Sequence, residues 1–243
     1  MCAAPTDRPD HAADSHLVGF VVAIDGPSGS GKSSVSKQVA RTLGFAFLDT
    51  GAMYRALTWW CLEQGIDLAD EGSVIDAARR LPLEIGIDPD QPRVSVDGVD
   101  VGVAIRESRI STRVSEVATI IPVREILRAH QRRLISEAGA AQGGVVAEGR
   151  DITTIVAPDA HVRILLTASE QARLARRSKE LHGDAAADSV AATRAQVLDR
   201  DRADSAVSEF IVAADGVTLI DTSDLDFDGS VRAVLDVVTA ARS

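Results

Sequence analysis

Residues 26–33 have the pattern G-x-x-x-x-G-K-S, which is typical of loops that bind phosphate groups. Glycines in such a loop let consecutive backbone N–H groups point into one concavity, which a polyphosphate can fill. Lys32 can place its ammonium on the terminal phosphates, and Ser33 can offer its hydroxyl to Mg²⁺. A helix that begins here would direct its positive N-terminal end at the same anion. The pattern predicts a site for a polyphosphate and Mg²⁺.

Two further segments combine arginine with neighbouring polar residues. One reads D-T-G-A-M-Y-R and ends at Arg55, and the other reads E-G-R-D and ends at Asp151. Guanidinium groups match phosphate oxygens, so Arg55 and Arg150 are candidates for holding an anionic substrate group. The Asp151 carboxylate can accept hydrogen bonds from a base. The residues alone also allow Tyr54 in the core, Arg55 as a surface charge, and Arg150 with Asp151 as a purely structural ion pair.

Weaker signals lie towards the C-terminus. Arg173, Arg176 and Arg177 occur near the end of a predicted helix and can form a lid over nucleotide phosphates, although isolated arginines are more often surface residues. Residues 199–205 alternate in charge, which usually indicates a solvated helix face. Neither pattern identifies a ligand by itself.

Apolar runs alternate with helical patterns along most of the chain. The strand candidates are residues 20–24, 45–48, 144–147, 162–166 and 217–220. The helix candidates are residues 33–43, 52–64, 122–138, 169–182, 189–201 and 230–241. This alternation predicts an α/β fold, a parallel sheet with helices on both faces. The phosphate loop then joins a strand to a helix, which argues against the alternative that residues 26–33 are a Gly/Ser-rich linker. Both arginine segments would lie at the carboxyl edge of the sheet, where ligands bind in such folds.

Residues 67–108 interrupt this alternation. A short helix pattern at residues 72–81 leads into a strand pattern, and valines then alternate on both sides of Asp97 and Gly98. Asp-Gly between alternating apolar residues is a strong signal for a β-hairpin. We therefore expect a small antiparallel subdomain inserted beside the substrate cleft. The core would comprise residues 18–66 and 109–243.

Composition limits the class of protein. The 243 residues are 45% hydrophobic, which is enough for one sizeable core. No run of 18 apolar residues occurs, and residues 1–17 lack the layout of a signal peptide, so we expect no membrane span, a disordered tail and a cytoplasmic protein. The net charge of −10 argues against nucleic acid as a partner. Cys2 and Cys61 form no metal or redox motif, and Cys61 is expected in the core.

Together these segments resemble the bacterial cytidylate kinases, a family of P-loop nucleoside monophosphate kinases. The resemblance covers residues 20–240 and rests on the phosphate loop and the two arginine segments. Supporting matches are Arg106, the V-R pair at 123–124, the R-D-x-x-D-S run at 200–205 and the inserted sheet. It implies a P-loop NTPase-type α/β fold, a lid near residues 173–188, and the reaction ATP + CMP or dCMP ⇌ ADP + CDP or dCDP, with Mg²⁺ bound with ATP. Nothing in the sequence suggests an obligate partner surface, so we expect a monomer.

The resemblance also assigns roles to residues. Lys32, Arg55 and Arg150 would be catalytic, because phosphoryl transfer depends on alignment and charge stabilisation rather than on a side-chain nucleophile. The residues implied at ATP are Gly26, Pro27, Ser28, Gly29, Ser30, Gly31, Lys32, Ser33, Ser34, Arg173, Arg176 and Arg177, with Ser33 at the metal. Those implied at the acceptor are Thr50, Tyr54, Arg55 and Arg150 for its phosphate, Ser115, Arg124 and Asp151 for cytosine, and Arg200 and Asp204 for the ribose. Asp151 would favour cytosine because cytosine has an amino donor at C4 where uracil has a carbonyl acceptor.

Two positions depart from the pattern of that family. Val207 stands where an arginine that clamps phosphate is usual, in a segment, residues 205–210, that looks shortened. Arg202 is a candidate to replace that arginine. Thr153 stands where a glycine is common, so we expect the local backbone to differ there.

Other functions remain open on the sequence. A P-loop kinase that acts on a different monophosphate or on a hydroxyl group would carry the same loop. A nucleotide-binding module with weak or no turnover is compatible with the altered segment at residues 205–210. A GTP-dependent switch would need a guanine-selecting N-K-x-D motif, which is absent from the chain.

Overall fold

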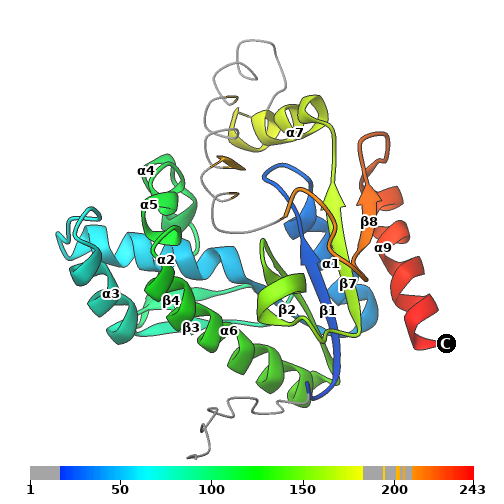
Figure 1. The fold of residues 1–243 in the computed structure, drawn as a ribbon, viewed down its shortest axis with the longest axis horizontal. Helices are drawn as coiled ribbons and strands as arrows, with labels where there is room; N and C mark the ends of the chain where they lie inside the picture. The colour runs from blue at the N-terminus through cyan, green and yellow to red at the C-terminus, as the bar shows by residue number, and fades with distance from the viewer. Residues whose placement is uncertain (1–16, 183–193, 195–200, 203–204, 206–209) are drawn as a thin grey trace, which may run out of the picture.

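The computed structural model describes residues 17–182, 194, 201–202, 205 and 210–243 (Figure 1). The predicted N-terminal tail, apart from Leu17, and most of the predicted helix at residues 189–201 lie outside these residues. Within the described part of the chain, no helix combines the length and the apolar character needed to cross a membrane.

The core of the described chain is a five-stranded parallel sheet with the order β2-β6-β1-β7-β8. Its strands are β1 (Phe20–Asp25), β2 (Ala46–Asp49), β6 (Gly144–Gly149), β7 (Val162–Thr167) and β8 (Thr218–Asp221). All five match the predicted strands to within one or two residues. The three inner strands are almost wholly apolar and buried, as expected for a parallel sheet with both faces covered.

Helices cover both faces of this sheet, which confirms the predicted fold (Figure 1). On one face lie α1 (Lys32–Leu43) and α9 (Phe227–Arg242), and on the other lie α6 (Ile121–Gln142) and the π-helical turn η2 (Ile152–Val156). Successive side chains of each strand point to opposite faces of the sheet and so contribute in turn to two apolar core layers. The first layer includes Val22, Ile24, Val35, Val39, Val146, Ile164 and Val234, and the second includes Val21, Ala23, Leu48, Ile135, Val145 and Ile152.

The predicted insertion is a separate three-stranded antiparallel sheet with the order β3-β4-β5. Its strands are β3 (Leu83–Ile85), β4 (Val94–Val96) and β5 (Val99–Asp100). The predicted hairpin turn is confirmed: Asp97 and Gly98 have φ values of 52° and 76°, as a two-residue turn with both central residues left-handed requires.

The remaining helices lie around the insertion and at the end of the sheet. They are α2 (Thr50–Glu63), α3 (Glu71–Arg80), η1 (Ala104–Arg106), α4 (Ser108–Ser111), α5 (Val114–Ala118) and α7 (Glu170–His182). Valines of the small sheet pack against Ala52 and Ala56 of α2, which joins the insertion to the core. The other side of α2 packs with α3, α5 and α6 around Leu57 and Cys61, so the prediction of a core thiol is confirmed.

The backbone of α6 touches the chain just before β1. A Cβ atom built on Gly139 would lie 2.0 Å from the carbonyl oxygen of Val18, and one built on Gly19 would lie 2.4 Å from the carbonyl oxygen of Gly139. Backbone atoms cannot give way as a flexible side chain can. The absence of side chains at these two positions therefore lets α6 lie against the chain directly before β1.

We expect Gly139→Ala to destabilise the protein by about 1–3 kcal/mol, because the clash outweighs the higher helix propensity of alanine. Urea unfolding measures this change. Gly72→Ala is a matched control on the exposed side of α3, where the new Cβ would meet only Asp70 at 3.4 Å and should leave stability unchanged or higher. Equal stability of the Gly139 variant and the wild type would contradict this account of the packing.

Candidate functional site

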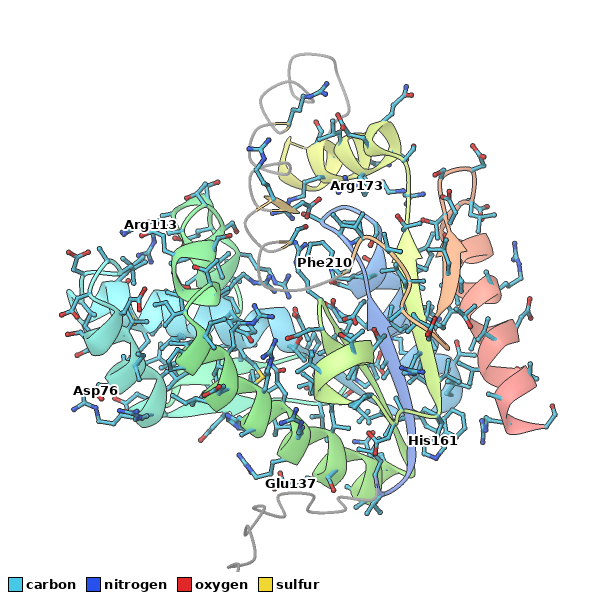
Figure 2. All side chains as sticks on the ribbon, in the orientation of Figure 1. Asp76, Arg113, Glu137, His161, Arg173 and Phe210 are labelled. Atoms are coloured by element: carbon cyan, nitrogen blue, oxygen red, sulfur yellow. The ribbon has the colours of Figure 1, made fainter. Side chains whose placement is uncertain are left out.

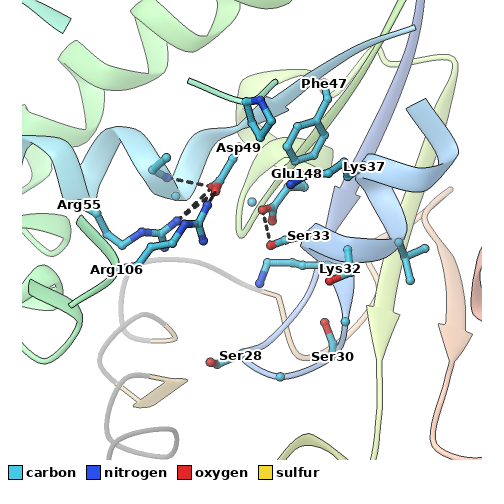
Figure 3. Close-up of a pocket in the computed structure, with 18 of the residues that line it drawn as sticks. Ser28, Ser30, Lys32, Ser33, Lys37, Phe47, Asp49, Arg55, Arg106 and Glu148 are labelled. Atoms are coloured by element: carbon cyan, nitrogen blue, oxygen red, sulfur yellow. Dashed lines mark hydrogen bonds and ion pairs between the residues drawn. The ribbon is translucent and has the colours of Figure 1, made fainter. Parts of the chain in front are cut away.

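A cleft of about 1060 Å³ lies at the carboxyl end of the parallel sheet (Figure 3). Its walls come from the phosphate loop, the start of α2, the small antiparallel sheet and the start of α9. Several residues singled out in the sequence line it: Ser28, Gly29, Ser30, Gly31, Lys32, Ser33, Ser34, Arg55, Arg150, Arg176 and Arg177. The insertion also contributes lining residues.

The phosphate loop curls tightly between β1 and α1. Gly29 and Gly31 have φ values of 76° and 88°, a left-handed conformation that favours glycine. A Cβ on Gly26 would lie 2.2 Å from the carbonyl oxygen of Leu166, and one on Gly29 would lie 2.5 Å from that of Arg173. The glycines therefore let the loop turn while lying against β7 and α7. The N-terminus of α1 begins directly at Lys32.

A hydroxyl and a carboxylate meet beside Lys32. Ser33 Oγ donates a 2.6 Å hydrogen bond to Glu148 Oε1, near the end of β6. Burial raises the pKa of Glu148, and the nearby Asp49 carboxylate adds to that effect. Glu148 was not among the predicted site residues, although its position at the end of a buried strand was visible in the sequence.

Asp49, directly before α2, forms ion pairs with two arginines (Figure 3). Its side chain caps the helix by accepting from the Ala52 N–H at 2.9 Å, and it pairs with Arg55 at 3.1 Å and with Arg106 at 3.2 Å. Burial alone would raise the pKa of Asp49, but Arg55 and Arg106 outweigh it and hold the pKa below its usual value. The Arg55 side chain is 11% exposed, so it is not a surface charge, and its Nε finds no acceptor among the described residues.

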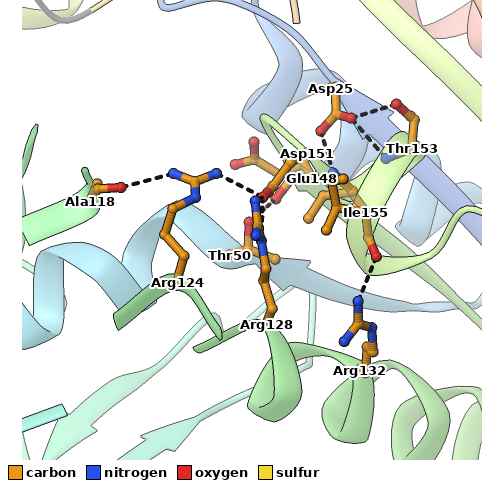
Figure 4. Close-up of polar contacts among 11 residues, drawn as sticks. Asp25, Thr50, Ala118, Arg124, Arg128, Arg132, Glu148, Asp151, Thr153 and Ile155 are labelled. Atoms are coloured by element: carbon orange, nitrogen blue, oxygen red, sulfur yellow. Dashed lines mark hydrogen bonds and ion pairs between the residues drawn. The ribbon is translucent and has the colours of Figure 1, made fainter. Parts of the chain in front are cut away.

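A second ion-pair cluster surrounds Asp151 (Figure 4). Arg124 donates to Asp151 Oδ2 at 2.7 Å and to the Ala118 carbonyl at 2.9 Å, and Arg128 donates to the same Oδ2 at 2.8 Å. The Arg124 guanidinium lies 5.8 Å from the ring centre of Tyr54. The structure thus brings together Arg124 and Asp151, which were predicted on one subsite, and adds Arg128, four residues along α6.

The other residues predicted at the acceptor lie near this cluster or outside the described chain. Thr50 is buried and donates to the Glu148 carbonyl at 2.8 Å. Tyr54 is buried in the core around α2, and burial raises its pKa to about 12. Ser115 is half-buried on α5, which packs against α2 and α6. Arg200 and Asp204, and Val207 in the altered segment, lie outside the described residues.

Asp201 connects the phosphate loop with two arginines. Its Oδ1 accepts from Arg150 at 2.9 Å and from the Ser28 N–H at 3.1 Å, while its Oδ2 accepts from Arg173. Arg173, on α7 (Figure 2), also donates to the Ser28 carbonyl at 2.9 Å. The Arg150 guanidinium lies 4.5 Å from the ring centre of Phe210. Asp201 was not among the predicted site residues, although it belongs to the R-D-x-x-D-S run that supports the family resemblance.

Arg176 holds the phosphate loop from the side of β8. It donates to the Ser30 carbonyl at 3.3 Å, to Thr222 Oγ1 at 2.9 Å and to the Thr222 carbonyl at 2.6 Å. Arg177, the next residue on α7, is half-buried and lines the cleft. The three arginines of α7 are therefore not isolated surface residues.

Asp25, at the end of β1, anchors the turn that follows Arg150 and Asp151. Its carboxylate accepts from the Ile152 N–H at 2.9 Å, the Thr153 N–H at 2.8 Å and Thr153 Oγ1 at 2.6 Å (Figure 4). Burial raises the pKa of Asp25 to about 6 despite these hydrogen bonds. The turn is π-helical, and the Thr153 side chain adds one of its anchors. Asp25 was not predicted as a site residue.

This raised pKa predicts a specific pH dependence of stability. Between the ordinary value of 3.8 and about 6, the folded chain binds a proton at Asp25 that the unfolded chain has released. The free energy of unfolding should therefore fall by roughly 1–3 kcal/mol as pH rises through this window, and this contribution should be constant above it. Urea unfolding of the wild type and of Asp25→Asn across the window measures the difference. Parallel curves for the two proteins would contradict the assignment, and Asp70→Asn at an exposed helix cap is the control.

The amino-acid sequence is similar to those of known enzymes over nearly its whole length. A family model described as cytidylate kinase matches residues 22–240. A cytidylate kinase of Streptomyces avermitilis is 46% identical over 235 residues, covering 96% of this chain and 99% of the relative. One of Rhodococcus opacus is 49% identical over 222 residues, covering 90% and 95%, and one of Streptomyces griseus is 44% identical over 223 residues, covering 91% and 94%. Because the match spans nearly the whole chain at this identity, the chain belongs to the cytidylate kinase family.

Proposed function

We propose that this protein transfers the γ-phosphoryl group of ATP to CMP or dCMP, giving CDP or dCDP and ADP. The observation that carries the proposal is the buried ion pair of Arg124 with Asp151. Asp151 directly follows Arg150, which lines the phosphate-binding cleft. Such a pair offers a hydrogen-bond donor beside an acceptor. Cytosine presents the complementary set, a ring-nitrogen acceptor beside an amino donor, whereas uracil presents a donor beside a carbonyl acceptor.

The nucleotide side of the cleft uses the phosphate loop and the arginines of α7. The loop N–H groups and Lys32 would bind the ATP phosphates, and the N-terminus of α1 adds its positive end. Arg173 and Arg176 both donate to loop carbonyl groups, so we assign them to shaping the loop around ATP. The proposed ATP-binding set is Gly26, Pro27, Ser28, Gly29, Ser30, Gly31, Lys32, Ser33, Ser34, Arg173, Arg176 and Arg177.

The acceptor side uses Arg55 and Arg150. The triphosphate of ATP and the phosphate of the acceptor repel each other, and guanidinium groups between them offset that repulsion during in-line attack of the acceptor oxygen. Arg55 Nε is a buried donor without an acceptor among the described residues, so it can bind a phosphate oxygen without breaking a hydrogen bond. The proposed acceptor set is Thr50, Tyr54, Arg55, Ser115, Arg124, Arg150, Asp151, Arg200 and Asp204.

The oxygens near Lys32 suit Mg²⁺ bound with ATP. Mg²⁺ is usually held by one or two protein oxygens together with substrate phosphates and water. Ser33 Oγ and the Glu148 carboxylate lie 2.6 Å apart beside the loop, and both are oxygen ligands. Ser33 would hold the ion directly and Glu148 would orient the hydroxyl. When bound, Mg²⁺ neutralises charge on the phosphates.

We further propose a monomer that acts in the cytoplasm without a nucleic-acid or membrane partner. The net charge of −10 is unfavourable for binding a phosphate backbone. The functional parts would be a core of residues 18–66 and 109–243, a lid near residues 173–188, and an acceptor-side subdomain of residues 67–108.

The experiment that tests the function is a coupled assay of ADP release with ATP and Mg²⁺, offering CMP, dCMP, UMP, AMP, GMP and dTMP in parallel. We expect turnover with CMP and dCMP. Lys32→Ala should abolish it, because the developing charge on the transferred group loses its ammonium partner. Preferred turnover of another acceptor would identify a different kinase, and ATP binding without turnover of any acceptor would identify a nucleotide-binding module.

Asp151→Asn tests the assignment of the base. The amide presents a donor where the carboxylate accepted, so we expect the ratio of kcat/KM for CMP to that for UMP to fall by about 10-fold or more. Parallel measurements of KM for ATP should show no change. A wild-type CMP preference in this variant would remove Asp151 from the base-binding site.

A further inference from the structure

Arg128 lies one helical turn after Arg124 on α6 and faces the same carboxylate. Residues four apart on a helix share a face, so Arg124, Arg128 and Arg132 form one row. The first two reach Asp151, while Arg132 donates to the carbonyl groups of Ile155 and Val156 in the π-helical turn (Figure 4). Nothing in the proposed function so far uses Arg128.

Both arginines donate to one oxygen of Asp151. Arg124 Nη2 lies 2.7 Å from Oδ2, and Arg128 Nε and Nη2 lie 2.8 Å and 2.6 Å from that same atom. A carboxylate oxygen has two lone pairs, so the hydrogen bonds from Arg124 Nη2 and Arg128 Nε leave Oδ2 no capacity for a further donor. Among the described residues, both hydrogen bonds from these arginines to Asp151 end on Oδ2 rather than on Oδ1. The arrangement thus makes the two oxygens of Asp151 different.

The burial of this cluster makes the second arginine costly. The side chains of Arg124 and Asp151 are each 5% exposed, and that of Arg128 is 16% exposed. One guanidinium already balances the charge of Asp151, and Arg124 is itself fixed by the Ala118 carbonyl. Burying a second guanidinium beside the same carboxylate adds a desolvation penalty to that of the Arg124–Asp151 pair. A role in holding the carboxylate in one orientation accounts for its presence.

We propose that Arg128 is a positioning residue for base selection: by occupying Oδ2, it leaves Oδ1 of Asp151 as the acceptor for the 4-amino group of cytosine. The inference rests on the proposed function, in which Asp151 contacts the base. With Arg124 alone, the carboxylate can turn about its terminal torsion and meet the base at an unfavourable angle. With Arg128 in place, the acceptor is held in advance, which strengthens its interaction with an amino group and its repulsion of a carbonyl oxygen.

The test compares Arg128→Leu with Arg132→Leu, a matched control on the same face of α6 that does not touch Asp151. The readouts are kcat and KM for CMP, dCMP and UMP at saturating ATP, and KM for ATP. For Arg128→Leu we expect kcat/KM for CMP to fall about 10- to 100-fold, the range for losing hydrogen bonds to a charged group. We expect a much smaller change for UMP, so the CMP/UMP ratio falls, while Arg132→Leu keeps the wild-type ratio.

Arg128→Lys keeps the charge without the forked geometry, so it should recover only part of the ratio. It also serves as the informative variant if Arg128→Leu does not fold. Equal losses with CMP and UMP, or an unchanged ratio, in the folded Arg128 variants would overturn the inference. Asp151→Asn in the same experiment separates the two claims: if it collapses the ratio while the Arg128 variants do not, only the role of Arg128 fails. If Asp151→Asn leaves the ratio intact, the base assignment fails with it.

Discussion

The structure depends on carboxylates buried at the carboxyl ends of parallel strands. Asp25 closes β1, Asp49 closes β2 and Glu148 lies one residue before the end of β6. The register of the parallel sheet pairs Asp49 with Glu148 and places Asp25 opposite Gly149, so all three lie at one edge. A buried carboxylate is tolerated only when it is hydrogen-bonded, paired with a cation or protonated. Each of these three must therefore attract donors from the loops that follow the strands.

Those donors belong to the segments that form the cleft. Ser33, at the start of α1, donates to Glu148, and this contact ties the phosphate loop to the central sheet. Asp49 organises the start of α2 and draws in Arg55 from that helix and Arg106 from the insertion. Asp25 fixes the turn after the E-G-R-D segment. The contacts that supply hydrogen-bond donors to these buried carboxylates are therefore the same contacts that shape the cleft.

Further acidic residues orient the cationic groups of the site. Asp201 holds Arg150 and Arg173 beside Ser28 of the phosphate loop, and Asp151 is held between two arginines of α6. An arginine that is already oriented loses less side-chain entropy when it binds a phosphate, and its dipoles need less reorganisation during the reaction. This arrangement suits phosphoryl transfer, which relies on alignment and charge more than on covalent chemistry.

The sequence by itself determined the phosphate loop, the five core strands, the hairpin at Asp97 and Gly98, and the segments that meet at the cleft. These features are local: turns require particular residues, and hydrophobic periodicity records which face is buried. The tertiary structure alone decided that Asp201 meets Ser28, that Asp25 anchors Thr153 and that Arg128 reaches Asp151. Such contacts join residues 173, 128 and 23 positions apart, so they depend on how helices and loops pack around the sheet, which no local pattern encodes.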